Sequence, residues 1–158
     1  MAEPVSKTFQ LPDVGATEQL GARLARLLPE GGSNCLVLLQ GELGAGKSSL
    51  ARAMIRALGH TGTVPSPTYT LIEPYQIENR QVYHADLYRI ADAEELEYLG
   101  WSDLQGAILL VEWPERAPEL FQVADLHIKM EFSNGGRVAR LIPRSPLGDS
   151  IVSGLNAD

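Results

Sequence analysis

Eight consecutive residues carry the clearest chemistry in the chain. Residues 41–48, GELGAGKS, match the pattern G-x-x-x-x-G-K-[ST] at every fixed position. The glycines permit a tight curl in which backbone N–H groups converge on phosphate oxygens. Lys47 would place a positive charge on the terminal phosphates, and the Ser48 hydroxyl would ligate Mg²⁺. This phosphate loop predicts a site for a nucleoside triphosphate, ATP, together with magnesium.

Two carboxylates end apolar segments elsewhere in the chain. Glu112 follows the apolar run 108–111, and Asp86 follows residues 82–85. A phosphate loop needs a second metal anchor, usually an acidic residue at the end of a neighbouring strand. Either carboxylate could hold Mg²⁺, directly or through water, and either could orient the attacking water. The residues alone leave these alternatives open.

A short Ser-Pro-Thr segment, residues 66–68, lies between the helix predicted after the phosphate loop and the next strand. A hydroxyl there could sense the γ-phosphate or its metal ion, as switch segments do in other nucleotide-binding proteins. The same residues would also serve as a simple turn, because proline fixes its own φ. Spacing does not decide between the two interpretations.

Apolar patterning predicts the elements that position these groups. The continuous apolar run Cys35–Gln40 is typical of a central strand buried on both faces. Strand, helix and strand in this order predict an α/β fold, a three-layer P-loop NTPase-like sandwich with a mixed central sheet flanked by helices. Thr17 is the predicted N-cap of the first helix. The other predicted strands are residues 8–11, 69–75, 81–86, 107–111, 124–132 and 137–142.

Composition excludes several classes of protein. No apolar run reaches the roughly 18 residues that cross a bilayer, and residues 1–10 do not resemble a secretory signal. One cysteine, Cys35, excludes an internal disulfide framework and a cysteine-based zinc site. We expect a cytoplasmic protein with no membrane partner.

The charge balance bears on nucleic-acid binding. Thirteen Lys and Arg residues against twenty Asp and Glu residues give a net charge of −7. Proteins that hold nucleic acid through its phosphates usually present a basic face, and the longest basic cluster here is only Arg137, Arg140 and Arg144. The charge disfavours DNA binding and tight, direct RNA binding. It favours action on RNA through a partner protein.

Four motifs, in order along the chain, carry a resemblance to a known family. GELGAGKSSL at 41–50, SPTYTL at 66–71, HADLYR at 84–89 and LVEWPER at 110–116 resemble the bacterial TsaE family, formerly YjeE, over about residues 11–142. The resemblance implies the ATPase component of the machinery that makes threonylcarbamoyladenosine in tRNA. It implies slow hydrolysis of ATP with Mg²⁺ and action on the TsaB–TsaD complex, which this ATPase would reset between turnovers. tRNA would be reached only indirectly, through that complex.

The resemblance also implies roles for individual residues. The catalytic residues would be Asp86, Lys47, Thr68 and Trp113, and the metal ligands Ser48, Glu112 and Asp86. The nucleotide would be bound by Gly41, Glu42, Leu43, Gly44, Ala45, Gly46, Lys47, Ser48, Ser49 and Arg137, with the adenine between residues 13–17 and the hairpin around Arg137. His84, Tyr88 and Arg89 complete the HADLYR motif without an assigned chemical role.

The domain division follows from length and from the end of the resemblance. A chain of 158 residues suits one domain. Residues 1–143 are predicted to form a single P-loop ATPase domain. Residues 144–158, which are rich in Ser, Gly and Pro, are predicted to form a flexible C-terminal tail.

Other classes of function fit the phosphate loop less well. A small-molecule kinase of the P-loop class, the main alternative, would usually carry an arginine-bearing lid, whereas residues 115–122 offer only Arg116. A GTPase would carry an [NT]KxD segment, and the sequence has none. A nucleotide sensor without turnover is a further alternative.

Overall fold

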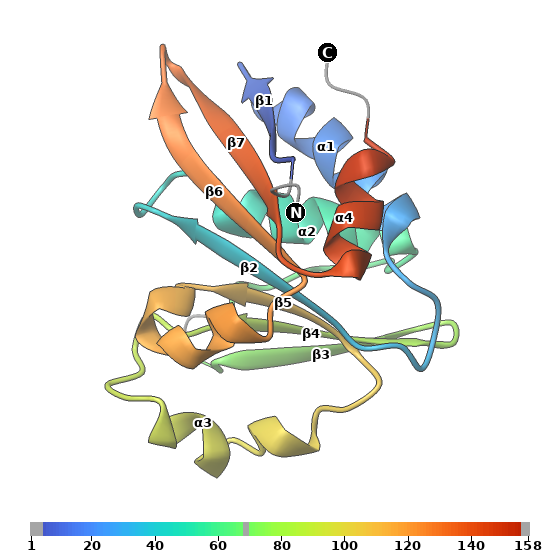
Figure 1. The fold of residues 1–158 in the computed structure, drawn as a ribbon, viewed down its shortest axis with the longest axis vertical. Coiled ribbons are helices and arrows are strands. Elements are labelled where there is room, and N and C mark those ends of the chain that lie inside the picture. Colours follow the sequence, from blue (N-terminus) through green and yellow to red (C-terminus); the bar gives the residue numbers. More distant parts are fainter. Residues whose placement is uncertain (1–4, 68–69, 156–158) are drawn as a thin grey trace.

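A single mixed sheet organises the computed structural model, which describes residues 5–67 and 70–155 (Figure 1). Within these residues the sheet has seven strands in the order β1-β7-β6-β2-β5-β4-β3. Strands β6, β2, β5 and β4 pair in parallel, whereas β7 pairs antiparallel with β1 and β6, and β3 with β4. The strands are β1 Lys7–Leu11, β2 Cys35–Gly41, β3 Ile72–Ile77, β4 Arg80–Asp86, β5 Ile108–Glu112, β6 Leu126–Ser133 and β7 Gly136–Pro143.

Two apolar cores lie on opposite faces of the sheet, because successive residues of a strand point to opposite sides. On β2, Val37 and Leu39 join one core, and Leu36 and Leu38 join the other. The first core is covered by α1 and α2, and the second by α3 and three short 3₁₀ helices. The helices are α1 Val14–Leu27, α2 Lys47–Leu58 and α3 Glu94–Tyr98, and the 3₁₀ helices are Trp101–Asp103, Pro114–Arg116 and Pro118–Gln122. The predicted three-layer α/β architecture is confirmed.

The first helix begins earlier than its predicted N-cap. The carboxylate of Asp13 accepts a hydrogen bond from the Ala16 N–H at 2.8 Å, so Asp13 caps α1. Thr17 lies inside the helix and is buried. The prediction was wrong because β1 ends at Leu11, and Asp13 is the first capping residue that the chain reaches after the strand.

Close packing joins α1 to α2. A Cβ atom at Gly21 of α1 would lie 2.5 Å from the Cβ of Ala53, so only glycine allows the two helices to approach this closely. Their packing fixes α2, and with it the phosphate loop that precedes α2. None of the helices in the described ranges is long and apolar enough to cross a membrane.

The segment predicted to be a flexible tail forms a helix instead. α4 spans Pro146–Ser153, and Ser145 caps it by accepting a hydrogen bond from the Gly148 N–H at 3.0 Å. Ile151 and Val152 are buried in the same core as α1 and α2. The Ser, Gly and Pro content suggested a tail. The segment is ordered because its apolar residues are buried in the core on one face of the sheet. Residues 156–158 lie outside the described residues.

Ile151→Ala tests whether α4 is part of the folded core. We expect the free energy of unfolding to fall by roughly 2–5 kcal/mol, as for other buried Ile residues truncated to Ala. Ser153→Ala on the exposed side of the same helix is the control, with an expected change within about 0.5 kcal/mol. Urea denaturation measures both, and equal stability of the two variants would contradict the packing of α4.

His127 on β6 is buried among polar partners and carries no role in the predicted site. Its Nε2–H donates to Gln40 Oε1 at 2.7 Å, and its Nδ1 accepts from Arg144 Nη2 at 3.4 Å. This is the neutral tautomer that an amide oxygen and a guanidinium together require. Burial, with Arg144 and Lys129 nearby, lowers the pKa of His127 to about 4.

The lowered pKa makes stability depend on pH. As pH falls from 6.5 towards 4, the unfolded imidazole gains a proton and the folded one does not, so the folded state loses stability. The loss attributable to His127 is about 3 kcal/mol by pH 4. We expect His127→Gln to flatten this part of the profile in urea unfolding at a series of pH values. A variant as sensitive as the wild type across this window would refute the assignment.

Candidate active site

The predicted phosphate loop, residues 41–48, connects β2 to α2 and needs glycine at several positions. Gly44 and Gly46 have φ values of +83° and +106°, in the left-handed region that L side chains rarely adopt. A Cβ at Gly41 would lie 2.4 Å from the Met130 carbonyl oxygen on the neighbouring β6. Gly46 precedes α2 without a side-chain cap, so the first N–H groups of this helix are open to an anion.

Lys47 is held above the loop by three groups. Its amine donates hydrogen bonds to the carbonyl oxygens of Gly41, at 2.5 Å, and Glu42, at 3.0 Å, and it lies 4.3 Å from the centre of the Trp113 ring. Burial lowers the pKa of Lys47, and the attraction of Glu112, Glu115 and Asp86 only partly offsets this effect. The amine is thus poorly hydrated, which strengthens its attraction for an incoming anion.

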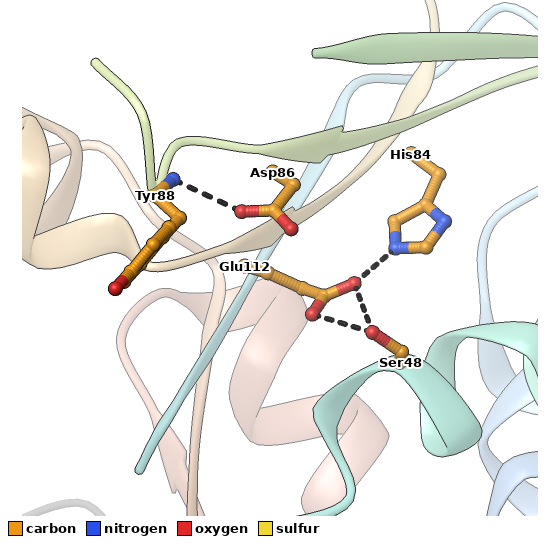
Figure 2. A network of polar contacts seen from close by, with 5 residues as sticks. All are labelled: Ser48, His84, Asp86, Tyr88 and Glu112. Atoms are coloured by element: carbon orange, nitrogen blue, oxygen red, sulfur yellow. Dashed lines mark hydrogen bonds and ion pairs between the residues drawn. The ribbon is translucent and has the colours of Figure 1, made fainter. Parts of the chain in front are cut away.

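Ser48 and Glu112 contact each other directly (Figure 2). The Ser48 hydroxyl lies 2.8 Å from Glu112 Oε1 and 3.0 Å from Oε2. Glu112 ends β5 and Asp86 ends β4, and the parallel register pairs the two residues side by side. Both carboxylates are buried, and Asp86 Oδ1 accepts a hydrogen bond from the Tyr88 N–H at 2.9 Å.

A cavity of about 310 Å³ unites these groups. It is lined by the phosphate loop together with Ser66, Asp86, Glu112 and Trp113. A second cavity of about 280 Å³ shares Gly44, Gly46 and Ser49 with the first. The second cavity is also lined by Leu11, Pro12, Asp13, Val14, Thr17 and, from the hairpin, Gly135, Gly136 and Arg137. The two cavities together offer space for a phosphate chain and for an adjoining base.

A family model described as threonylcarbamoyl adenosine biosynthesis protein TsaE matches residues 11–141. The chain belongs to the TsaE family. A Haemophilus influenzae protein named tRNA threonylcarbamoyladenosine biosynthesis protein TsaE is 39% identical over 152 residues, 94% of this chain and 96% of that protein. A Synechocystis protein of the same name is 46% identical over 121 residues, 73% of this chain and 74% of that protein.

A solved structure of the same architecture supports the fold. The crystal structure of Bacillus subtilis YdiB superposes with a TM-score of 0.71 at 21% sequence identity, covering 97% of this chain and 95% of that one. At this identity the likeness concerns the fold alone. The α/β assignment of this TsaE-family chain therefore stands on both its own strand order and an independent structure.

Trp113 adopts a backbone conformation that is uncommon outside glycine. Its φ is +57°, in the left-handed region, directly after the strand that ends at Glu112. The ring packs beneath the Lys47 amine and lies 4.9 Å from the Tyr88 ring. Such strain persists where the surroundings hold it in place, and it is common at functional sites. Trp113 lines the same cavity as Lys47.

The structure places most of the predicted site residues around the two cavities. Arg137 donates from Nε to the Gly44 carbonyl oxygen at 3.1 Å, which ties the hairpin to the phosphate loop. Within the loop, Ala45 is buried, whereas the Leu43 side chain is 76% exposed and points away from the core. Thr68, predicted to be catalytic, lies outside the described residues.

The cavity offers few side chains that could bind Mg²⁺. Among the described residues, no group of three or more His, Cys, Asp and Glu side chains lies close enough to hold a metal ion. Mg²⁺ at nucleotide sites takes one or two protein groups and completes its shell with phosphate oxygens and water. The Ser48 hydroxyl and the Glu112 carboxylate, already in contact, fit that requirement.

His84 belongs to the site, although no chemical role was predicted for it. It is 1% exposed, and its Nε2 lies 2.6 Å from Glu112 Oε2. His84 precedes Asp86 by two residues on β4, so both side chains point to the same face of the sheet. The spacing of two residues was the signal in the sequence that His84 shares a face of the sheet with Asp86. The contact with Glu112 could be inferred only once β5 was known to pair with β4.

Proposed function

We propose that this chain binds ATP with Mg²⁺ at residues 41–49 and hydrolyses it slowly, in support of threonylcarbamoyladenosine modification of tRNA. One observation carries the proposal. The Ser48 hydroxyl lies within 3.0 Å of both Glu112 oxygens, in the same cavity as Lys47 and Asp86. A phosphate-binding loop, a hydroxyl–carboxylate metal pair and a second carboxylate are the parts that phosphoryl transfer to water requires.

Each residue would act at a separate part of the nucleotide. The backbone N–H groups of residues 44–48 would receive the β-phosphate, and the Lys47 amine would leave the loop carbonyls to contact the terminal phosphates. Ser48 and Glu112 would hold the ion, which would neutralise charge on the β- and γ-phosphates. Asp86 would orient the attacking water, since its carboxylate is buried at the same strand edge as Glu112.

The base would occupy the cavity beside the hairpin. Pro12 and Val14 offer apolar contact there, and Arg137 crosses from the hairpin to the phosphate loop. The chain lacks the [NT]KxD segment that would select guanine. ATP is therefore the proposed nucleotide.

The proposed partner is the TsaB–TsaD complex, with tRNA reached through it. The named relatives are all tRNA threonylcarbamoyladenosine biosynthesis proteins. A net charge of −7 favours contact with a protein over a direct hold on tRNA phosphates. In this scheme ATP turnover resets the complex, the setting is cytoplasmic, and no energy is supplied to the transfer of the threonylcarbamoyl group itself.

Phosphate release tests the proposal. We would measure it from ATP and from GTP, first with the chain alone and then with the TsaB–TsaD pair and tRNA. Slow, ATP-selective, magnesium-dependent release that rises with the partners is the expected result. Release that ignores the partners but responds to a small-molecule acceptor would instead identify a kinase.

A further inference from the structure

His84 contacts Glu112, the carboxylate proposed to hold magnesium. Among the described residues this is the only hydrogen bond of its side chain. The contact joins Nε2 to Glu112 Oε2 at 2.6 Å, with the two side chains 2% and 3% exposed. The other ring nitrogen, Nδ1, is buried and has no hydrogen-bond partner among the described residues. Figure 2 shows a ring nitrogen of His84 directed at one oxygen of Glu112, and the Ser48 hydroxyl in contact with both oxygens of the same carboxylate.

The second buried histidine of the sheet provides a comparison within the molecule. His127 has a partner for each ring nitrogen, Gln40 and Arg144, as a buried histidine with a structural role is expected to have. His84 leaves Nδ1 unpaired in an interior where an unpaired polar atom is costly. The contact with Glu112 is therefore the interaction that accounts for a polar ring at this position.

The chemistry of the carboxylate fixes the direction of this hydrogen bond. An ionised carboxylate only accepts, so Nε2 carries the proton and donates to Oε2. In a neutral ring with this tautomer, Nδ1 presents a lone pair and not an N–H. A buried donor without a partner is thereby avoided.

The arrangement leaves the two oxygens of Glu112 in different situations. His84 holds Oε2 from the side of the core, and Ser48 bridges both oxygens from the side of the cavity. If the Ser48 hydroxyl turned to the ion, Oε1 would lose its hydrogen bond from Ser48, while Oε2 would keep its bond to His84. Carboxylates that bind metals are commonly fixed in this way by a second hydrogen-bonded group.

We propose that His84 is a positioning residue of the magnesium site, which holds Glu112 Oε2 so that Oε1 faces the ion or its water ligand. The inference rests on the proposed function, because it presupposes that Glu112 takes part in binding Mg²⁺. It assigns His84 no contact with the nucleotide and no proton transfer. Its effect is on the affinity for the ion.

The test compares two substitutions of similar length, one that keeps an N–H donor and one that lacks it. His84→Gln can donate from Nε2 to Glu112, whereas His84→Met cannot. We would titrate Mg²⁺ against the affinity for a fluorescent, non-hydrolysable ATP analogue. His84→Met should raise the apparent dissociation constant for Mg²⁺ by about 10- to 100-fold. His84→Gln should restore most of the affinity, and analogue binding in EDTA should be the same in both variants.

Two further variants separate a local effect from a general one. In Glu112→Ala, adding His84→Met should weaken Mg²⁺ binding no further, since the histidine acts through the glutamate. His60→Gln is the control for loss of an imidazole, because His60 lies just beyond the far end of α2 from the phosphate loop. It should leave the magnesium titration unchanged.

The outcomes distinguish this inference from the proposed function. Wild-type protein that binds the analogue equally with and without Mg²⁺ would refute the magnesium site and the inference with it. A clear magnesium dependence in the wild type that His84→Met leaves unaltered, or that His84→Gln weakens equally, would refute the role of His84 alone. The wild type offers a test independent of any variant's folding, because ¹⁵N shifts report the tautomer. An Nε2 without a proton would overturn the proposal.

Discussion

We expect Lys47→Ala to lower ATP turnover by at least about 100-fold, the usual loss when one donor to a developing charge is removed. The amine is buried beside the loop carbonyls and the Trp113 ring. A water molecule that filled its place in the variant would not supply its positive charge. Nucleotide affinity should fall by roughly 10- to 100-fold, from the loss of a charge-assisted hydrogen bond. Phosphate release at saturating ATP and titration with a fluorescent ATP analogue measure the two effects.

The control for Lys47→Ala is Lys129→Ala on β6. Lys129 is exposed and lines a neighbouring cavity that also contacts Gly41, but it takes no part in the proposed site. Its removal should leave turnover within about twofold of the wild type, because Lys129 is exposed and lines neither of the two cavities of the proposed site. If Lys47→Ala turned over ATP as the wild type does, the assignment of residues 41–48 as a phosphate loop would be wrong.

The second large effect is expected from Asp86→Asn. Asparagine keeps the shape of the side chain and an oxygen for the Tyr88 N–H, but it loses the negative charge. Turnover should fall by about 10²- to 10⁴-fold, the range over which general base catalysis contributes. Affinity for ATP should stay near the wild-type value, since the loop and Lys47 are untouched.

The measurement for Asp86→Asn separates binding from turnover. Affinity is taken from titration with the ATP analogue, and turnover from phosphate release with ATP and Mg²⁺ both saturating. Asp103→Asn, at an exposed aspartate of the 3₁₀ helix Trp101–Asp103, is the matched control and should change neither quantity. Turnover retained in Asp86→Asn would leave Asp86 as a structural carboxylate.

The two carboxylates differ in ways that the sequence pattern did not separate. Both end parallel strands, and the sequence alone left either as the metal anchor. In the structure Glu112 contacts the Ser48 hydroxyl and His84, whereas Asp86 accepts from the backbone at Tyr88. This difference favours Glu112 as the ligand of the ion and Asp86 as the group that orients water.

The sequence by itself determined the parts of this protein that depend on neighbours along the chain. The tight turn at residues 41–48 was predictable because its curl needs glycines at set positions, and the helix that follows begins at Lys47 as expected. Strand β2 was predictable because a strand buried on both faces is apolar throughout. The four motifs indicated the TsaE family, which the family match over residues 11–141 confirmed.

Tertiary structure alone decided the contacts between residues far apart in sequence. His84 and Glu112 are 28 positions apart, and their contact required the parallel register of β4 and β5. The docking of α4 escaped prediction because a polar composition does not show that Ile151 has a core to enter. The cation–π contact of Lys47 with Trp113 likewise depends on where two chain segments meet in space. The local sequence pattern indicates which secondary structure a segment prefers. Which other segments it packs against is decided by the whole fold.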